Sequence, residues 1–166
     1  DDRYNKVKAL CENSGRRFEF AFLLDALEEE QQQGITIDVT EVPWRFNGRE
    51  YTIIDTPGHK EFLKNMVGGA SKADAAVLVV DAQEGLKAHF QRQVAVMALL
   101  GIPKIIVALN KMDLVDWSQK VFHEREQQLD QVFRDAGMRP AHVIPVGGWQ
   151  GANLLENSKE MPWYKG

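Results

Sequence analysis

Residues 75–81 read Ala75-Ala76-Val77-Leu78-Val79-Val80-Asp81, an uninterrupted apolar run that ends in a carboxylate. A short run of this kind is typical of a strand buried on both faces of a parallel sheet. The pattern returns in residues 104–110 and again in residues 142–146. We therefore expect three parallel strands whose carboxyl ends meet at one edge of a sheet, where ligands bind in the loops that follow.

Helical patterns separate these expected strands. Residues 89–100 carry apolar side chains at helical spacing and precede Gly101, and residues 118–136 do the same before Gly137. Strands that alternate with helices predict an α/β fold in which a parallel sheet is covered on both faces.

The N-terminal half reads as a helix followed by a hairpin. Residues 18–33 have a helical apolar face and stop at Gly34, after which residues 35–46 alternate in the manner of a strand. Asn47-Gly48 is a strong hairpin turn signal ahead of a return strand over residues 51–55. Two further helices are expected, a short one with a turn in residues 1–17 and one over residues 59–67 ended by Gly68-Gly69.

The composition is that of an ordinary soluble globular protein. The chain has 166 residues, which favours one domain, with 44% hydrophobic and 27% charged residues. Its net charge of -4 argues against a surface dedicated to nucleic acid or anionic lipid, so we expect no direct DNA binding and no membrane partner. The single Cys11 excludes an intramolecular disulfide, and together with a start unlike a signal peptide it indicates a cytoplasmic location.

Asp55-Thr56-Pro57-Gly58-His59 follows the return strand of the hairpin. A carboxylate at a strand end, here Asp55, can hold Mg²⁺ directly or through water. The N–H of Gly58 can approach a terminal phosphate closely because no side chain intervenes, and His59 can orient an attacking water. A plain strand-to-helix turn explains the same pattern, and the pattern alone does not decide between the two.

Asn110-Lys111-Met112-Asp113 follows the second apolar strand. The Asp113 carboxylate can accept hydrogen bonds from the ring N–H and the exocyclic amine of guanine, a pair of donors that adenine lacks. The Lys111 stem can cover the face of the base, and Asn110 can tie neighbouring loops together. The competing interpretation is an ordinary turn, because Asn and Asp are common after strands.

Gly34-Ile35-Thr36 joins the first long helix to the hairpin. The Thr36 hydroxyl can complete a Mg²⁺ shell and its backbone N–H can meet a phosphate, although a capped helix end accounts for this motif taken by itself. The three motifs occur in this order, each after the element that it needs, which makes coincidence a minor possibility.

Together these motifs resemble the GTPase domain of elongation factor Tu-like proteins, over about residues 18–166. The segments that carry the resemblance are residues 33–38, Asp55-Thr56-Pro57-Gly58-His59, Lys64-Asn65-Met66 and Asn110-Lys111-Met112-Asp113. The resemblance implies a P-loop NTPase-type (Ras-like) three-layer fold with a mostly parallel sheet and one antiparallel edge hairpin. It also implies hydrolysis of GTP to GDP and phosphate, with GTP or GDP and Mg²⁺ bound.

The same resemblance implies a role for each matching residue. Thr36 and Asp55 would be the Mg²⁺ ligands, Thr36 and Gly58 would read phosphate, and His59 would position the catalytic water beside Ile35, one wing of a hydrophobic gate. The guanine base would be read by Asn110, Lys111, Asp113, Gly147, Gly148 and Trp149. Gly147 stands where the family usually has serine, so we expect this last loop to be less braced.

Two branches of the family fit. Residues 22–30 leading into residues 34–38, and also residues 65–71, look most like the GTPase subunit of bacterial ATP sulfurylase, whose partner would be a separate catalytic sulfurylase subunit. Residues 148–166 look equally like the archaeal and eukaryotic tRNA-carrying factor, whose partners would be aminoacyl-tRNA and the ribosome. Gln33, where translation factors usually have arginine, counts slightly against translation, and we favour the sulfurylase branch.

The phosphate loop Gly-x-x-x-x-Gly-Lys-Ser/Thr does not occur in these residues. The family places this loop before the position at which the sequence begins, so we expect residues 1–166 to be a partial GTP-binding domain lacking the first strand, the P-loop and the first helix. Such a chain should hold guanine weakly and turn GTP over negligibly by itself. An inactive fragment of a GTPase is therefore a third interpretation.

Overall fold

The computed structural model describes residues 38–58 and 62–166. The chain divides into two compact units, Asp1–Lys72 and Ala73–Gly166. The predicted helices in residues 1–33 lie outside the described residues. The same holds for three of the predicted site residues, which are Ile35, Thr36 and His59.

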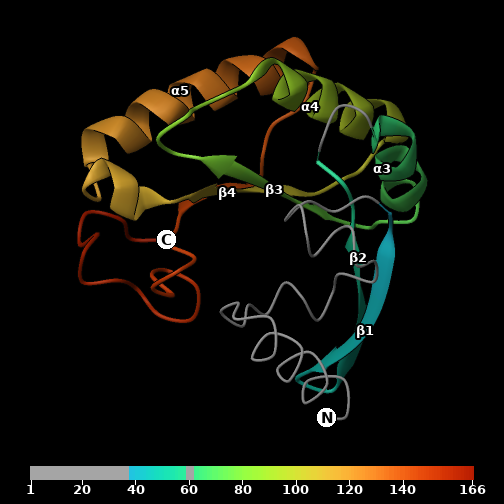
Figure 1. Ribbon diagram of the computed structural model, residues 1–166, viewed down its shortest axis with the longest axis horizontal. Helices are drawn as coiled ribbons and strands as arrows, with labels where there is room; N and C mark the ends of the chain where they lie inside the picture. Colours follow the sequence, from blue (N-terminus) through green and yellow to red (C-terminus); the bar gives the residue numbers. More distant parts are fainter. Residues whose placement is uncertain (1–37, 59–61) are drawn as a thin grey trace, which may run out of the picture. The chain divides into compact units, whose positions relative to one another are not determined.

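The second unit is built on a parallel sheet of the predicted kind. Its strands are β3 (Ala76–Asp81), β4 (Ile105–Asn110) and β5 (His142–Pro145), in the order β3-β4-β5. The helices that connect them, α4 (Ala88–Leu100) and α5 (Gln119–Asp135), lie over the same face of the sheet (Figure 1). The α/β fold expected from the apolar runs is therefore confirmed.

The core of this unit lies between the sheet and the two helices. Val107 and Leu109 of β4 are fully buried, as are Val94 of α4 and Phe133 of α5. Phe133 meets Phe90 edge-on, with ring centroids 6.2 Å apart. None of the helices in the part of the chain that the structure describes has the length and apolarity needed to span a bilayer.

The other face of the sheet is more open than the sequence predicts. Val77 and Val79 of β3 are 64% and 67% exposed, whereas Leu78 and Val80 between them are buried. The described residues thus cover one face of β3 and do not supply the expected cover on the other.

The first unit contains an antiparallel hairpin of β1 (Thr40–Phe46) and β2 (Arg49–Asp55). Both turn residues have positive φ, 48° at Asn47 and 76° at Gly48, which is the type I′ turn that this dipeptide predicts. Strand β1 begins at Thr40, so residues 38 and 39 of the predicted strand lie before it, and residues 35–37 lie outside the described residues. Just before the strand, the Asp38 carboxylate accepts the Val39 N–H at 2.8 Å.

Helix α3 (Leu63–Ala70) corrects a second prediction, since it runs through Gly68-Gly69 where we expected it to stop. A Cβ at position 69 would lie 2.6 Å from Cγ2 of Thr56 and 3.2 Å from Cγ2 of Ile54. Gly69 therefore permits close packing of α3 on the end of β2 and does not terminate the helix.

Candidate functional site

Three strand ends meet at one edge of the sheet in the second unit. Asp81 and Asn110 are the last residues of β3 and β4 and are partners in the parallel register. The Val146 N–H donates to the Leu109 carbonyl at 2.8 Å, which brings the chain after β5 to the same edge. The residues that follow β5, Gly147-Gly148-Trp149, are called the β5 loop.

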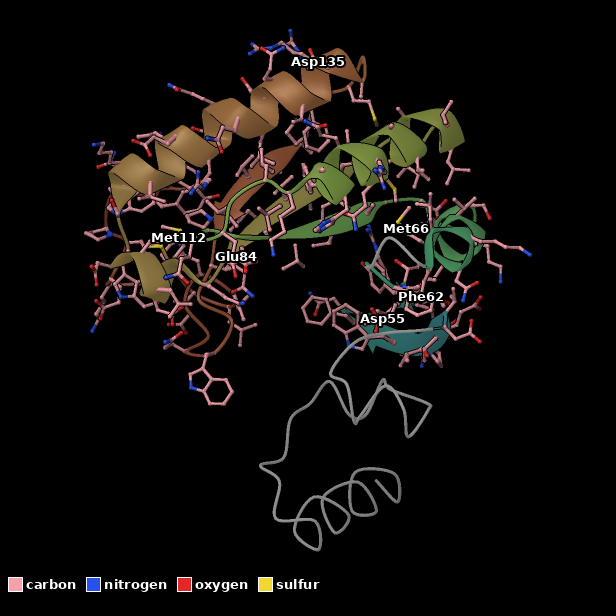
Figure 2. The ribbon with its side chains drawn as sticks, turned by 45° about the horizontal axis from the view of Figure 1, so that its top comes forward. Asp55, Phe62, Met66, Glu84, Met112 and Asp135 are labelled. Carbon is pink, nitrogen blue, oxygen red and sulfur yellow. The ribbon has the colours of Figure 1, made fainter. Side chains whose placement is uncertain are left out.

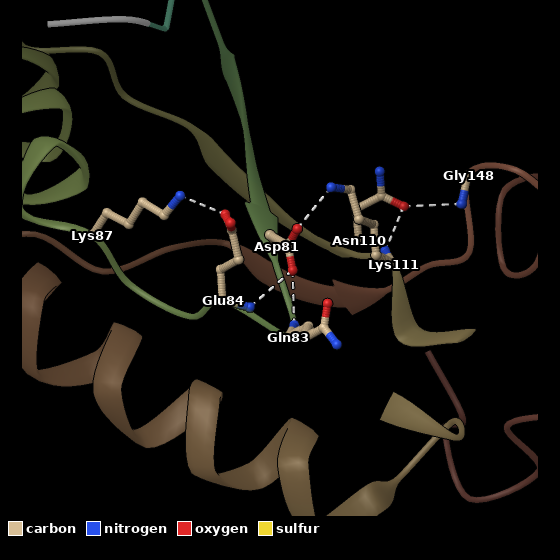
Figure 3. Close-up of polar contacts among 7 residues, drawn as sticks. All are labelled: Asp81, Gln83, Glu84, Lys87, Asn110, Lys111 and Gly148. Carbon is tan, nitrogen blue, oxygen red and sulfur yellow. Dashed lines mark hydrogen bonds and ion pairs between the residues drawn. The ribbon is translucent and has the colours of Figure 1, made fainter. Parts of the chain in front are cut away.

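Asn110 joins the loop after β4 to the β5 loop. Its Oδ1 accepts the backbone N–H of Lys111 at 2.7 Å and that of Gly148 at 2.9 Å, as Figure 3 shows. One amide oxygen therefore holds the two loops predicted to read the base at a fixed separation.

Lys111 is fixed by Asp81, a residue to which sequence reasoning gave no role. The Lys111 Nζ lies 2.8 Å from Oδ2 of Asp81, while Oδ1 accepts the N–H groups of Gln83 at 2.8 Å and Glu84 at 3.0 Å (Figure 3). The Asp81 side chain is only 16% exposed, against 55% for Lys111. The Lys111 ammonium group is thus anchored, while more than half of the Lys111 side chain stays exposed.

The protonation of this pair follows from its contacts. Partial burial alone would raise the pKa of Asp81, but the hydrogen bonds from Lys111, Glu84 and Gln83 hold that pKa below its usual value. The hydrogen bond and the charge of Asp81 raise the pKa of Lys111, with smaller contributions from Glu84 and Asp113. Both groups are therefore charged at neutral pH.

Asp113 lies on the short 3-10 helix η3 (Met112–Val115), which follows Lys111 directly. Lys111 has a left-handed backbone with φ of 62°, which turns the chain sharply from β4 into η3. Met112 is fully buried, and its N–H donates to the Val146 carbonyl at 3.2 Å. With Met112 held in this way, the half-buried Asp113 lies beside the edge of the sheet at which β3, β4 and β5 end.

The β5 loop is held by its own backbone and by a neighbouring ring. Gly147 and Ala152 exchange two backbone hydrogen bonds, of 3.1 and 3.0 Å. A Cβ at position 147 would lie 2.6 Å from Cη2 of Trp117, so the indole ring fills the space where a side chain would be. Trp149, the last loop residue, is 68% exposed.

The predicted phosphate side belongs to the first unit. Asp55, labelled in Figure 2, ends β2 opposite Thr40. It is half-buried, Pro57 is buried and Gly58 is exposed. Of the two predicted Mg²⁺ ligands, Asp55 is described, and its carboxylate is the hard oxygen donor that Mg²⁺ prefers. Thr36 lies outside the described residues, as do Ile35 and His59.

The predicted base residues all belong to the second unit, where Asn110 is bonded to Gly148, and the predicted phosphate residues are only partly described. Residues 3–161 match the family described as the elongation factor Tu GTP binding domain. The chain belongs to this family. It is a GTP-binding domain of the translation-factor type.

Curated relatives of this domain include elongation factors 1-alpha. That of Thermococcus gammatolerans is 46% identical over 152 residues, which cover 92% of this chain and 36% of the relative. That of Methanosphaera stadtmanae is 43% identical over 149 residues, covering 89% of this chain and 36% of the relative. The chain therefore spans about a third of the length of the relatives it matches.

Solved structures also superpose on this chain. A bacterial selenocysteine-specific elongation factor superposes with a TM-score of 0.69 at 31% identity, covering 77% of this chain and 22% of that one. The GTPase-like domain of Saccharomyces cerevisiae Ski7 superposes with a TM-score of 0.78 over 98% of this chain and 40% of that one, and its 20% identity supports the fold alone. These relatives favour the translation-factor interpretation over the sulfurylase branch that we preferred from the sequence.

Proposed function

We propose that this chain is the GTP-binding switch domain of a translation factor of the elongation factor 1-alpha type, which carries aminoacyl-tRNA to the ribosome. The observation that carries the proposal is the bond from the Gly148 N–H to Asn110, with Lys111 anchored on Asp81 beside it. This arrangement orders a base site before any ligand arrives, so little ordering entropy remains to oppose binding. The elongation factor 1-alpha relatives support the translational part of the proposal.

On the base side, Asp113 would accept hydrogen bonds from the ring N–H and the exocyclic amine of guanine. The Lys111 stem would lie along the face of the base, and the backbone of the β5 loop would meet the guanine oxygen. Adenine would leave these groups unpaired, which costs about 1–3 kcal/mol for each buried polar group without a partner.

On the phosphate side, the whole protein would hydrolyse GTP by in-line attack of water on the γ-phosphate. His59 would orient the water beside Ile35, and Gly58 would present its N–H to the γ-phosphate. Thr36 and Asp55 would hold Mg²⁺, which neutralises charge on the phosphate oxygens when it is bound.

The base site is tested on this chain by nuclear magnetic resonance, which detects weak binding. Millimolar GDP should shift the backbone amide signals of Lys111 and Gly148, and the same concentration of ADP should leave them in place. Asp113→Asn should abolish the GDP response, whereas Asp116→Asn, a change of the same kind in an exposed residue nearby, should keep it. Equal responses to GDP and ADP would refute the guanine assignment.

The catalytic part is tested in the whole protein. His59→Ala should cut GTP hydrolysis strongly and spare nucleotide affinity, because His59 is proposed to act on the water and not on the base. An equal loss of hydrolysis and affinity would count against that role.

The translational part has its own test. GTP-dependent retention of aminoacyl-tRNA by the whole protein should be seen, and it should fall when GDP replaces GTP. Co-purification of a sulfurylase catalytic subunit without tRNA retention would return the assignment to sulfate activation.

A further inference from the structure

The β5 loop begins with Gly147, whose backbone conformation does not require a glycine. Six described glycines have a positive φ, and Gly147 is not among them. A Cβ at position 147 would instead lie 2.6 Å from Cη2 and 2.8 Å from Cζ3 of Trp117. Separations under about 3 Å are far inside van der Waals contact, so any side chain here would displace the indole ring or the loop.

Trp117 is itself held by the backbone on both sides. Its N–H donates to the Met112 carbonyl at 2.9 Å, and its carbonyl accepts the indole N–H of Trp163 at 3.1 Å. Its φ of 54° is uncommon for a bulky residue and persists only where the surroundings enforce it.

Trp163 is secured in turn by its neighbours. Its ring lies 5.2 Å from that of Phe122 on α5 and 6.3 Å from that of Tyr164, centroid to centroid. The Tyr164 hydroxyl donates to the Val143 carbonyl of β5 at 3.4 Å. The C-terminal residues thus connect the backbone of Trp117 to both α5 and the sheet.

The contact between Trp117 and Gly147 lies one residue before Gly148, whose N–H orders the base site. Gly148 donates to Asn110 at 2.9 Å, and a Cβ at position 148 would come within 3.1 Å of the same Asn110 Oδ1. Gly148 is packed closely against Asn110, so a displacement of Gly147 should alter the hydrogen bond between the Gly148 N–H and Asn110.

We propose that Trp117 is a positioning residue for the β5 loop, acting as a matched pair with Gly147 and secured by Trp163. The indole ring fixes how far Gly147 lies from η3. This distance in turn fixes the geometry of the hydrogen bond from the Gly148 N–H to Asn110. The inference rests on the proposed guanine site, because it assigns Trp117 an effect on guanine affinity. Trp117 itself touches no ligand in this role.

The first arm of the test needs no nucleotide. Gly147→Ala should shift the amide signal of Gly148 and speed its hydrogen exchange by about tenfold, the scale of one weakened hydrogen bond. Adding Trp117→Leu to this variant makes room for the methyl group and should restore both readings in large part. Gly68→Ala, at a glycine with no neighbour within 4 Å of the new methyl group, should change neither reading.

The second arm is a double-mutant cycle on GDP affinity. Gly147→Ala and Trp117→Leu should each weaken GDP binding, and the double variant should bind at least about threefold more tightly than the product of the two losses predicts. Trp163→Phe, which removes the indole N–H and keeps a ring, should weaken binding less than Trp117→Leu.

The outcomes separate the two proposals. Additive losses of affinity, with the Gly148 amide unchanged in Gly147→Ala, would overturn the positioning role while leaving the guanine site in place. Absence of any GDP response in the unaltered chain would overturn the guanine site, and the nucleotide-free arm would still decide whether Trp117 positions the loop.

Discussion

The two described regions of the molecule contrast in how they bury apolar side chains. Along β4 every second residue is buried, and Val107 and Leu109 are inaccessible to solvent. Along β1 and β2 no residue is buried, and Trp44 and Phe46 stack 5.3 Å apart while each stays about half exposed. The base side of the site therefore rests on a packed core, whereas the strand that leads to Asp55 does not.

This difference follows from what covers each set of strands. Two long helices pack on one face of the parallel sheet, and the apolar area they remove from water stabilises it by about 25 cal/mol per Å². Segments with few buried apolar contacts open locally at lower free energy. We expect the base site to keep its geometry under conditions in which the hairpin opens.

The largest expected effect comes from removing a core side chain of the second unit. Phe133→Ala should lower the free energy of unfolding by about 3–5 kcal/mol, because Phe133 is fully buried against Phe90. Trp44→Ala in the hairpin should cost less than about 1 kcal/mol, since the Trp44 side chain is already 48% exposed. Denaturant titration followed by residue-resolved amide signals of the two units measures both.

The contrast would be refuted by equal losses in the two variants. It would also be refuted if the amide signals of β1 and β2 persisted to a higher denaturant concentration than those of β4, because the hairpin would then be the more stable element.

The second effect concerns adjacent glycines of α3. Gly69→Ala should destabilise the first unit by about 1–3 kcal/mol, since its methyl group would meet Thr56 at 2.6 Å. Gly68→Ala should stabilise α3 by about 0.5–1 kcal/mol, because position 68 is open and alanine favours helix. Thermal unfolding of the pair measures the difference, and a shift of the same sign in both would contradict the packing role of Gly69.

The third effect is on the base site itself. Asp81→Asn removes the charge that anchors Lys111. Because the Lys111 side chain is 55% exposed, solvent screens this interaction, and the free energy of GDP binding should weaken by about 1 kcal/mol, or about fivefold in affinity. Glu84→Gln, which removes a neighbouring carboxylate that pairs with Lys87 and acts on Lys111 more weakly than Asp81 does, should reduce affinity much less. Titration with GDP distinguishes the two, and an equal effect of both would show that only net charge matters.

The same pair predicts a pH dependence. The pKa of Asp81 is lowered in the folded chain, so its stabilising contribution is present above the pKa of an unfolded aspartate, about 3.9, and is lost as the pH falls through the lower folded value. The pKa of Lys111 is raised in the folded chain. Its contribution to stability is therefore fully present below the pKa of an unfolded lysine and is lost as the pH rises through the folded pKa. The Glu84 amide signal should therefore stay constant near neutral pH and move only in acid, and a midpoint above pH 4 would contradict this assignment.

Much of the fold could be predicted from local pattern. The apolar runs placed β3, β4 and β5 within a residue or so of their observed bounds, because a buried parallel strand needs an unbroken run. Asn47-Gly48 placed the hairpin turn, since few other dipeptides accept two positive φ values. The strand-end rule selected the loops of Asn110 and Gly147 before any contact was known.

The rest depended on contacts between residues far apart in the chain. Glycine at position 69 serves packing while glycine at position 101 ends a helix, and only the neighbour at Thr56 distinguishes the two uses. The pairing of Asp81 with Lys111 requires the register of β3 on β4. No sequence spacing signals that Trp117 lies against Gly147.

The smallest expected effect sharpens the contrast between the two regions, because it concerns a well-formed contact in the exposed one. Arg45 and Glu50 face each other across the hairpin with an N–O distance of 2.9 Å, yet their side chains are 74% and 79% exposed. At such exposure the Coulomb energy is offset by side-chain ordering and screened by salt, so Glu50→Gln should change stability by less than about 0.5 kcal/mol. Thermal unfolding at low and at high salt should show a small shift that vanishes with salt. A loss as large as that of Gly69→Ala would mean that this pair, and not packing of α3 on β2, holds the hairpin in place.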